Sequence, residues 1–247
     1  MDQEYIAGKN PVLEALRAGR EINKIWIAEG SQKGAMKQVM ELARERKVAV
    51  QFVPKKRIDQ VADGAHQGVL ALVAAYRYAE TGDMFKLAKE RNEHPFILIL
   101  DELEDPHNLG SILRTADAVG AHGVIIPKRR SVALTATVAK ASTGAIEHIP
   151  VARVTNLSQT IAGLKQQGLW IAGTDASGTT DYRQMDADLP LGLVIGSEGR
   201  GMSRIVKEAC DFLIRLPMAG HVTSLNASVA AGLLMYEVYR KRHPLGE

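Results

Sequence analysis

The sequence predicts an α/β fold in which an open parallel sheet follows a smaller α/β domain. Between residues 96 and 216, continuous apolar runs are separated by amphipathic stretches, as expected for strands buried on both faces. A shorter alternation of strand-like and helix-like patterns fills roughly the first 75 residues. Between them lies a polar stretch of mixed charge with Gly82 and Pro95 as breakers, which indicates a linker.

In the first part of the chain, strand-like and helix-like patterns alternate. The run INKIWIA is typical of a strand, and an amphipathic helical pattern follows it. The predicted strands are 22–28, 48–53 and 68–75, and the predicted helices are 11–18, 36–46 and 55–61. These elements suffice for a small independent domain, and no motif within it demands catalysis.

The second part repeats the alternation more regularly. The predicted strands are 96–101, 123–127, 169–173, 191–196 and 212–216, and the predicted helices are 109–119, 134–141, 157–167 and 202–209. In open parallel sheets, ligands bind beyond the carboxyl ends of the strands, so polar clusters at these ends are the candidate sites. The expected division is a first domain over 1–76, a linker over 77–94 and a second domain over 95–247.

Composition indicates an ordinary protein of the cytoplasm. The N-terminus is polar, and the longest apolar runs are far shorter than the ~20 residues that span a bilayer, so no membrane partner is expected. A single cysteine, Cys210, excludes an internal disulfide. The net charge of +3 arises within residues 1–80, where 13 Lys and Arg face 10 Asp and Glu. This excess fits either contact with nucleic acid or a solvated basic surface.

The stretch from Leu216 to Arg240 contains the first polar cluster. Pro217 and Gly220 interrupt the chain, and a helix is then predicted with Ser224 as its cap. Ser224 and Asn226 can serve simply as caps, or they can hold a polar ligand at the start of the helix. These two interpretations do not exclude each other.

Two further polar clusters follow strands of the second domain. Asn108 lies at the opening of a helix that presents Arg114 nearly two turns later, and an arginine there is commonly only a surface ion-pair partner. Residues 196–201, Gly-Ser-Glu-Gly-Arg-Gly, join a strand to a helix, and glycines there let the backbone approach a ligand. The pattern is neither a dinucleotide fingerprint nor a phosphate-binding loop.

Together these clusters resemble a known family. The segments NLGSILRTA at 108–116, IGSEGRGM at 195–202 and LPM with SLNASVA between 216 and 230 are similar, in this order, to the three signature motifs of the SpoU family of RNA ribose 2′-O-methyltransferases. The resemblance implies the SPOUT fold, a parallel sheet with a deep C-terminal trefoil knot. It also implies a homodimer and S-adenosylmethionine as the cofactor, bound in a bent conformation in the knot.

The resemblance also implies roles for residues of the site. Arg114 is the catalytic residue of the family. We expect it to stabilise the developing 2′-alkoxide and grip the adjacent phosphate, because a guanidinium resists deprotonation. Glu198 would orient Arg114 through an ion pair. No metal site is expected. The remaining catalytic residues are Asn108, Ser224 and Asn226, and the cofactor-binding residues are Thr174, Gly196, Leu216 and Leu225.

The first domain resembles the substrate-binding domain of the family's ribosomal-RNA branch, in GKNPVLEAL at 8–16 and HQGV at 66–69. This likeness implies methylation of a guanosine in the peptidyl-transferase loop of 23S rRNA, on free RNA or an assembling large subunit. Alternatives are a relative acting on tRNA or on the thiostrepton-resistance site, and a catalytically silent RNA-binding assembly factor. The expected RNA contacts, through phosphates, are Lys9, Arg17, Lys55, Lys56 and Arg57.

Overall fold

The chain forms two compact units, the first made of Met1–Arg77 with Ala133–Ala136 and the second of Tyr78–Val132 with Thr137–Glu247. The structure is a computed structural model. It describes residues 5–17, 19–31, 33–62, 66–73, 77–221 and 223–245.

The first unit is a four-stranded sheet with the strand order β1-β4-β2-β3. Strands β2 and β3 are parallel, whereas β4 runs antiparallel to both β1 and β2. The strands are β1 (Tyr5–Ala7), β2 (Ile22–Ala28), β3 (Ala49–Val53) and β4 (Val69–Val73), and the helices are α1 (Lys9–Arg17), α2 (Lys33–Glu45) and α3 (Lys55–Asp59). Most predicted boundaries lie within two residues of these.

Strand β2 explains why this sheet carries helices on both faces. Ile25 and Ile27 pack in one core cluster with residues of α1 and α2. Trp26 and Ala28 point to the other face, where they pack with Ile58 of α3. Since successive side chains of a strand alternate between faces, an almost continuous apolar run buries both sides of the sheet.

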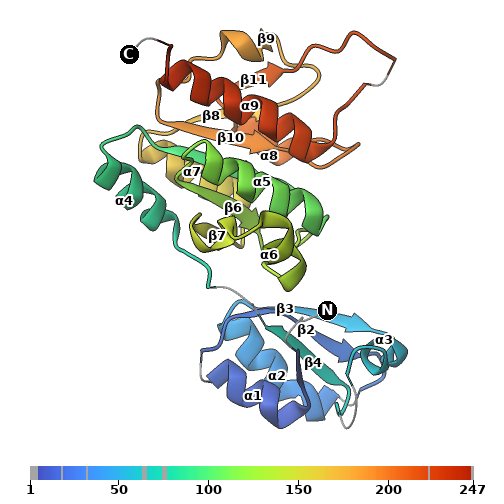
Figure 1. The fold of residues 1–247 in the computed structure, drawn as a ribbon. Helices are drawn as coiled ribbons and strands as arrows, with labels where there is room; N and C mark the ends of the chain where they lie inside the picture. The colour runs from blue at the N-terminus through green and yellow to red at the C-terminus, as the bar shows by residue number, and fades with distance from the viewer. Residues whose placement is uncertain are drawn as a thin grey trace. The chain divides into compact units, whose positions relative to one another are not determined.

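The second unit is a seven-stranded parallel sheet with the strand order β7-β6-β5-β10-β8-β11-β9 (Figure 1). All of its pairings are parallel, as the sequence predicted. Its strands are β5 (Phe96–Leu100), β6 (Gly123–Pro127), β7 (Val151–Val154), β8 (Trp170–Thr174), β9 (Thr180–Asp181), β10 (Leu191–Ile195) and β11 (Phe212–Arg215).

Helices cover both faces of this sheet. Helices α4, α7 and α8 contribute to one core cluster with the central strands, while α5 and α9 lie side by side on the other face (Figure 1). Every residue of β5 and β10 is buried. The helices are α4 (Thr81–Arg91), α5 (Pro106–Ala118), α6 (Ala136–Ser142), α7 (Leu157–Gln166), α8 (Arg204–Ala209) and α9 (Ala227–Arg242), with short 3-10 turns η1 (Ala145–Glu147) and η2 (Tyr182–Gln184). The trefoil knot stays a prediction.

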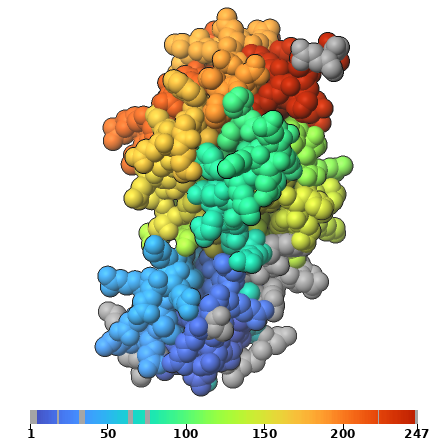
Figure 2. Space-filling model, turned by 90° about the vertical axis from the view of Figure 1, so that its left-hand side faces the viewer, coloured from blue at the N-terminus to red at the C-terminus, as the bar shows by residue number. Residues whose placement is uncertain are grey.

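Short edge elements escaped the sequence prediction. Strands β1, β7 and β9 have two to four residues each, too few to show a period. The stretch predicted as a linker contains α4, whose Met84 is fully buried in the core of the second unit. Figure 2 shows α4 packed on the surface of that unit. This stretch is therefore part of the second unit and not a linker, because the few apolar residues of α4 face the core.

The predicted cap of the last helix was wrong. Helix α9 begins at Ala227, and its cap is Asn226, not Ser224. The Asn226 side-chain oxygen accepts hydrogen bonds from the backbone N–H groups of Ser228 (2.9 Å) and Val229 (3.3 Å). Both residue types are good caps, so sequence alone could not separate two candidates two positions apart. Among the described residues, no helix combines the length and apolar character needed to cross a bilayer.

His122, just before β6, ties the end of α4 to the sheet. Its ring is 1% exposed. Its Nδ1 accepts from the backbone N–H of Phe96 (3.0 Å), so Nε2 carries the proton and faces the Glu93 carboxylate at 3.1 Å. Burial lowers the pKa of His122 below its ordinary value, and the nearby Glu93 only partly opposes this shift. The neutral ring is therefore the form that fits the folded protein.

We predict that the second unit loses stability as the pH falls from about 8 to about 5. The folded state keeps His122 neutral, whereas the unfolded chain protonates it near its ordinary pKa of about 6.5, so acid favours unfolding below that pH. Urea unfolding at several pH values, followed by Trp170 fluorescence in a Trp26→Phe background, measures the slope of the free energy of unfolding against pH. His122→Gln should flatten it, and His221→Gln, at an exposed histidine, should not. Equal slopes in the two variants would contradict the role of His122.

Candidate active site

Three loops at the carboxyl edge of the second sheet come together around Asn108. The first begins helix α5, where Asp105 accepts hydrogen bonds from the backbone N–H groups of His107 (3.1 Å) and Asn108 (3.3 Å). Pro106 occupies the first turn of α5, where backbone N–H groups have no partner within the helix, so the absence of an N–H on proline costs no helical hydrogen bond. Asp105 therefore fixes the start of α5, and Asn108 becomes a buried residue of its first turn.

The second loop follows β10 and folds back on itself. Backbone hydrogen bonds join Ser197 and Gly201 in both directions, at 3.1 and 2.9 Å. A Cβ on Gly196 would lie only 2.3 Å from the backbone of Gly201 and of Met202. Only glycine fits at position 196, because the backbone of residues 201–202 lies where a Cβ would be. Gly196 also lines a cleft.

The third segment is the start of α9, and it meets the other two at Glu198. The Glu198 Oε1 accepts hydrogen bonds from the Asn108 side-chain amide (2.9 Å), the backbone N–H of Ala227 (3.2 Å) and the Asn226 amide. The Asn226 amide also donates to Asn108 Oδ1 at 3.0 Å. One carboxylate oxygen thus joins segments that are about 90 and 30 residues apart in sequence.

A cleft of about 420 Å³ opens on one side of Glu198, and we call it the β10 cleft. All four predicted cofactor-binding residues line it, as does Ser224. Its walls combine glycine backbone with apolar side chains and few charges, which is the usual composition of a small-molecule site. Residues lining it include Thr174, Gly196, Leu216, Met218, Leu225 and Leu234.

A second, smaller space of about 280 Å³ lies on the other side of Glu198. We call it the acidic hollow, because four of its lining residues are carboxylates. Ser197, Glu198 and Arg200 line both spaces and form the wall between them. The hollow is lined by Glu102, Leu103, Glu104, Asp105, Asn108, Ser197, Glu198 and Arg200.

Arg114 is not part of this cluster within one chain. It is exposed and makes no hydrogen bond or ion pair with the residues that the structure describes. Six residues separate it from Asn108 on α5, which places it about 9 Å further along the helix and about 120° around it. The predicted ion pair with Glu198 is therefore absent from the described part of the chain, and amide groups occupy Glu198 instead.

Two supporting residues were missed by the sequence analysis. Asp101, at the end of β5, accepts from the backbone N–H of Ser203 at 2.7 Å and so anchors the far end of the second loop. Asp175, which lines the β10 cleft, pairs with Lys207 at 2.9 Å. Its hydrogen bonds to Ser177 and Lys207 lower the Asp175 pKa despite partial burial. A polar residue directly after an apolar strand was the available signal in both cases.

Three of the five predicted RNA contacts share one short helix of the first unit. Lys55, Lys56 and Arg57 are exposed on α3, and they form no ion pair with any described residue. The acid of α3, Asp59, is held by the His66 ring at 2.7 Å. The helix therefore presents uncompensated positive charge.

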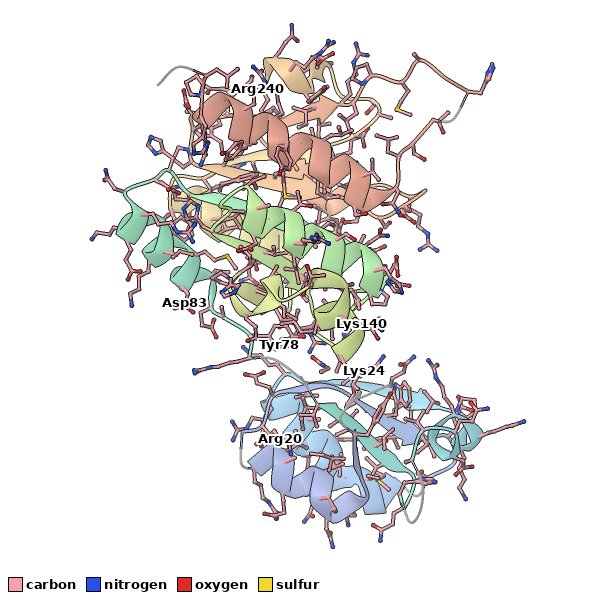
Figure 3. The ribbon with its side chains drawn as sticks, in the orientation of Figure 1. Arg20, Lys24, Tyr78, Asp83, Lys140 and Arg240 are labelled. Atoms are coloured by element: carbon pink, nitrogen blue, oxygen red, sulfur yellow. The ribbon has the colours of Figure 1, made fainter. Side chains whose placement is uncertain are left out.

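Trp26 lies beside this helix between two cations. The guanidinium of Arg57 is 4.7 Å from the ring centroid, and the ammonium of Lys24 is 5.2 Å from it. Figure 3 shows Lys24 on the face of the sheet away from α1 and α2. By contrast, Arg17 lies on α1 and pairs with Glu14 at 2.7 Å. The backbone N–H of Lys9 donates to Gln67.

A parallel α/β sheet with ligand spaces beyond the carboxyl ends of its strands is the arrangement of a ligand-binding α/β domain. Residues 95–236 match the SpoU rRNA Methylase family, and residues 5–79 match the RNA 2′-O ribose methyltransferase substrate-binding domain. Because the first match alone spans more than half of the sequence, this chain belongs to the SpoU rRNA methylase family.

Whole-length relatives agree with this assignment. A Bacillus subtilis protein, YacO, assigned to the TrmH family of tRNA/rRNA methyltransferases, is 66% identical over 99% of this chain and 98% of its own length. A Staphylococcus aureus protein with the same family assignment is 59% identical over the full length of both chains.

Solved structures show the same fold. The AviRb methyltransferase of Streptomyces viridochromogenes, in complex with AdoMet, covers 97% of this chain and 90% of its own, with 26% identity and a TM-score of 0.62. An AdoMet-bound rRNA methyltransferase from Sinorhizobium meliloti covers 98% of this chain and 88% of its own, with 30% identity and a TM-score of 0.59.

We predict that Gly196→Ala weakens binding of S-adenosylmethionine at least about tenfold, because the added methyl group forces the backbone of 196–202 apart. Isothermal titration calorimetry with the full chain measures this loss. Gly163→Ala on α7 is the matched control, since its Cβ would meet nothing within 4 Å. If both variants bound the cofactor as tightly as the wild type, the β10 cleft would not be the cofactor site.

Proposed function

We propose that this RNA 2′-O-methyltransferase uses S-adenosylmethionine to methylate the ribose of a guanosine in 23S rRNA, in the peptidyl-transferase loop. The observation that carries the proposal is the convergence of Asn108, Glu198 and Asn226 between two adjoining spaces. One space suits the cofactor, and the other suits the sugar that receives the methyl group.

The β10 cleft fits S-adenosylmethionine in size and in chemistry. Backbone groups around Gly196, Leu216 and Leu225 can bind adenine without charged partners, and buried backbone groups discriminate well. Thr174 and Asp175, which also line the cleft, offer polar contacts. The bound cofactor would supply an electrophilic methyl group.

The protein's own residues would orient and stabilise the ribose. Asn108 and Asn226, held rigidly through Glu198, would position the sugar and the motif loops, with Ser224 at the rim. Arg114 would stabilise the developing 2′-alkoxide and hold the adjacent phosphate, which receives or relays the proton. Because Arg114 does not contact the Glu198 cluster of its own chain, this role requires Arg114 of a second copy of the chain.

A homodimer would bring Arg114 to the site. Helix α9 exposes a row of large apolar side chains beside α5: Val229 at 51%, Leu233 at 46% and Tyr236 at 53%. Such a row is costly to leave in water and fits a second copy of the chain. With α5 and α9 forming the interface, Arg114 of one copy would serve the Glu198 cluster of the other.

The first unit favours rRNA over tRNA as the substrate. The rRNA methyltransferase from S. meliloti covers 98% of this chain, whereas the TrmH/SpoU tRNA-modifying enzyme of A. aeolicus covers only 64%. The match to the rRNA enzyme therefore includes the substrate-binding domain. Within it, Lys55, Lys56 and Arg57 of α3 are the proposed phosphate contacts, together with Lys9 and Arg17 of α1.

Deleting the gene should remove one ribose methylation from a large-subunit rRNA guanosine. Mapping of 2′-O-methyl marks across rRNA and tRNA measures this. The mark should return with the wild-type gene and with Arg44→Ala, at an exposed arginine of α2 outside the three motifs, but not with Arg114→Ala. Loss of a tRNA mark instead would refute the rRNA target. A protein that failed to bind S-adenosylmethionine in calorimetry would point to a silent assembly factor.

Mixing two inactive variants tests the shared site. Arg114→Ala and Asn226→Ala should each lose at least about a hundredfold in kcat. After subunit exchange, mixed dimers would contain one intact site, so the mixture should recover about a quarter of wild-type activity if Arg114 acts across the interface. No recovery, with dimers demonstrably exchanged, would place Arg114 and Asn226 in the same chain's site.

A further inference from the structure

Two loops beside the acidic hollow hold an unusual pair of residues. Glu102, after β5, and Arg130, after β6, both have left-handed backbone conformations, with φ values of 55° and 53°. Residues other than glycine rarely adopt this conformation, because it costs free energy. The two side chains face each other, with Arg130 donating to Glu102 Oε1 at 2.8 Å.

A backbone hydrogen bond ties the same two loops together. The N–H of Val132 donates to the carbonyl oxygen of Leu103 at 2.9 Å. Glu102 and Leu103 both line the acidic hollow, next to Asn108 and Glu198. The loop over residues 128–132 therefore lies against two residues that line the space proposed for the ribose.

The two partners of this ion pair differ greatly in exposure. The Glu102 side chain is 20% exposed, whereas the Arg130 side chain is 74% exposed. Glu102 accepts a hydrogen bond from one terminal nitrogen of Arg130, and a guanidinium has five N–H donors. Most of the hydrogen-bonding capacity of Arg130 thus remains available to solvent or to a ligand.

The negative charge of the acidic hollow makes a nearby cation important for RNA binding. Glu102, Glu104, Asp105 and Glu198 all line it, and their carboxylates would repel an RNA backbone that brings a ribose to Asn108. Arg200, which lines the hollow, and Arg130, which pairs with the lining residue Glu102, bring opposing charge. An ordinary surface ion pair contributes little to stability and would not explain two strained backbones.

We propose that Arg130 binds a backbone phosphate of the RNA next to the target ribose, and that Glu102 is the positioning residue that holds its guanidinium beside the hollow. This inference rests on the proposed function, because it concerns the same RNA. The planar fork of Arg130 can accept Glu102 on one side and phosphate oxygens on the other. Arg129, the exposed neighbour, adds positive charge to the same loop.

The first test is Arg130→Gln in the full-length enzyme, with unmodified large-subunit rRNA transcribed in vitro as the probe. The KM for RNA should rise roughly tenfold, while kcat at saturating RNA and affinity for S-adenosylmethionine stay unchanged. The slope of log binding constant against log salt should fall by about 0.7–0.9, which is the loss of one phosphate contact. The matched control is Arg183→Gln, which breaks a similar exposed pair with Asp181 at the other edge of the sheet.

Glu102→Ala distinguishes positioning from simple charge. Removing a carboxylate beside RNA should tighten binding if only net charge mattered. If Glu102 positions Arg130, the same change should weaken binding and leave the salt slope close to that of the wild type. Tighter RNA binding by Glu102→Ala would therefore overturn the positioning role.

Arg130→Lys covers the case in which Arg130→Gln disturbs the loop. A phosphate contact predicts that Lys keeps the salt slope, whereas a purely structural arginine predicts that Lys and Gln behave alike. If the enzyme methylates RNA and Arg130→Gln matches Arg183→Gln in KM and salt slope, the inference fails. If the wild type methylates no RNA, the proposed function fails instead.

Discussion

The candidate site depends on one carboxylate oxygen. Glu198 Oε1 accepts N–H groups from Asn108, Asn226 and the backbone of Ala227, so the loops after β5, β10 and β11 are joined at a single atom. Charge-assisted hydrogen bonds of this kind are stronger and more directional than neutral ones. Because Asn226 also caps α9 and Asn108 lies in the first turn of α5, the same contacts fix two helices relative to the sheet.

The glycines around this atom set how closely the loops approach. Gly196 has backbone where a Cβ would be, and Gly110 on α5 would place a Cβ only 2.3 Å from that of Ala141 on α6. Backbone therefore packs against backbone at Gly196, and α5 packs closely against α6 at Gly110. A rigid wall around Glu198 separates the β10 cleft from the acidic hollow, which suits a reaction that needs two ligands held in line.

The proposed function assigns RNA recognition mainly to the first unit and chemistry to the second. The first unit offers a cationic surface that Trp26 helps to organise and that Asp59 does not neutralise, since His66 holds Asp59 away. The second unit offers a polar cluster with a carboxylate-rich hollow, for which Arg200 and Arg130 provide the opposing charge. In the proposed function, long-range attraction to RNA and close positioning of one sugar would thus depend on different residues.

Sequence by itself determined the alternation of elements, the parallel sheet, the family and the residues of the three motifs, because apolar period and motif spacing are local properties. Tertiary structure alone decided which of these residues meet. Asn226 rather than Ser224 caps α9, Glu198 binds amides rather than Arg114, and α4 packs into the second unit. The left-handed pair of Glu102 and Arg130 carries no sequence signal either. Contacts between residues 30 to 100 positions apart depend on how the sheet brings its loops together, and no local pattern records that.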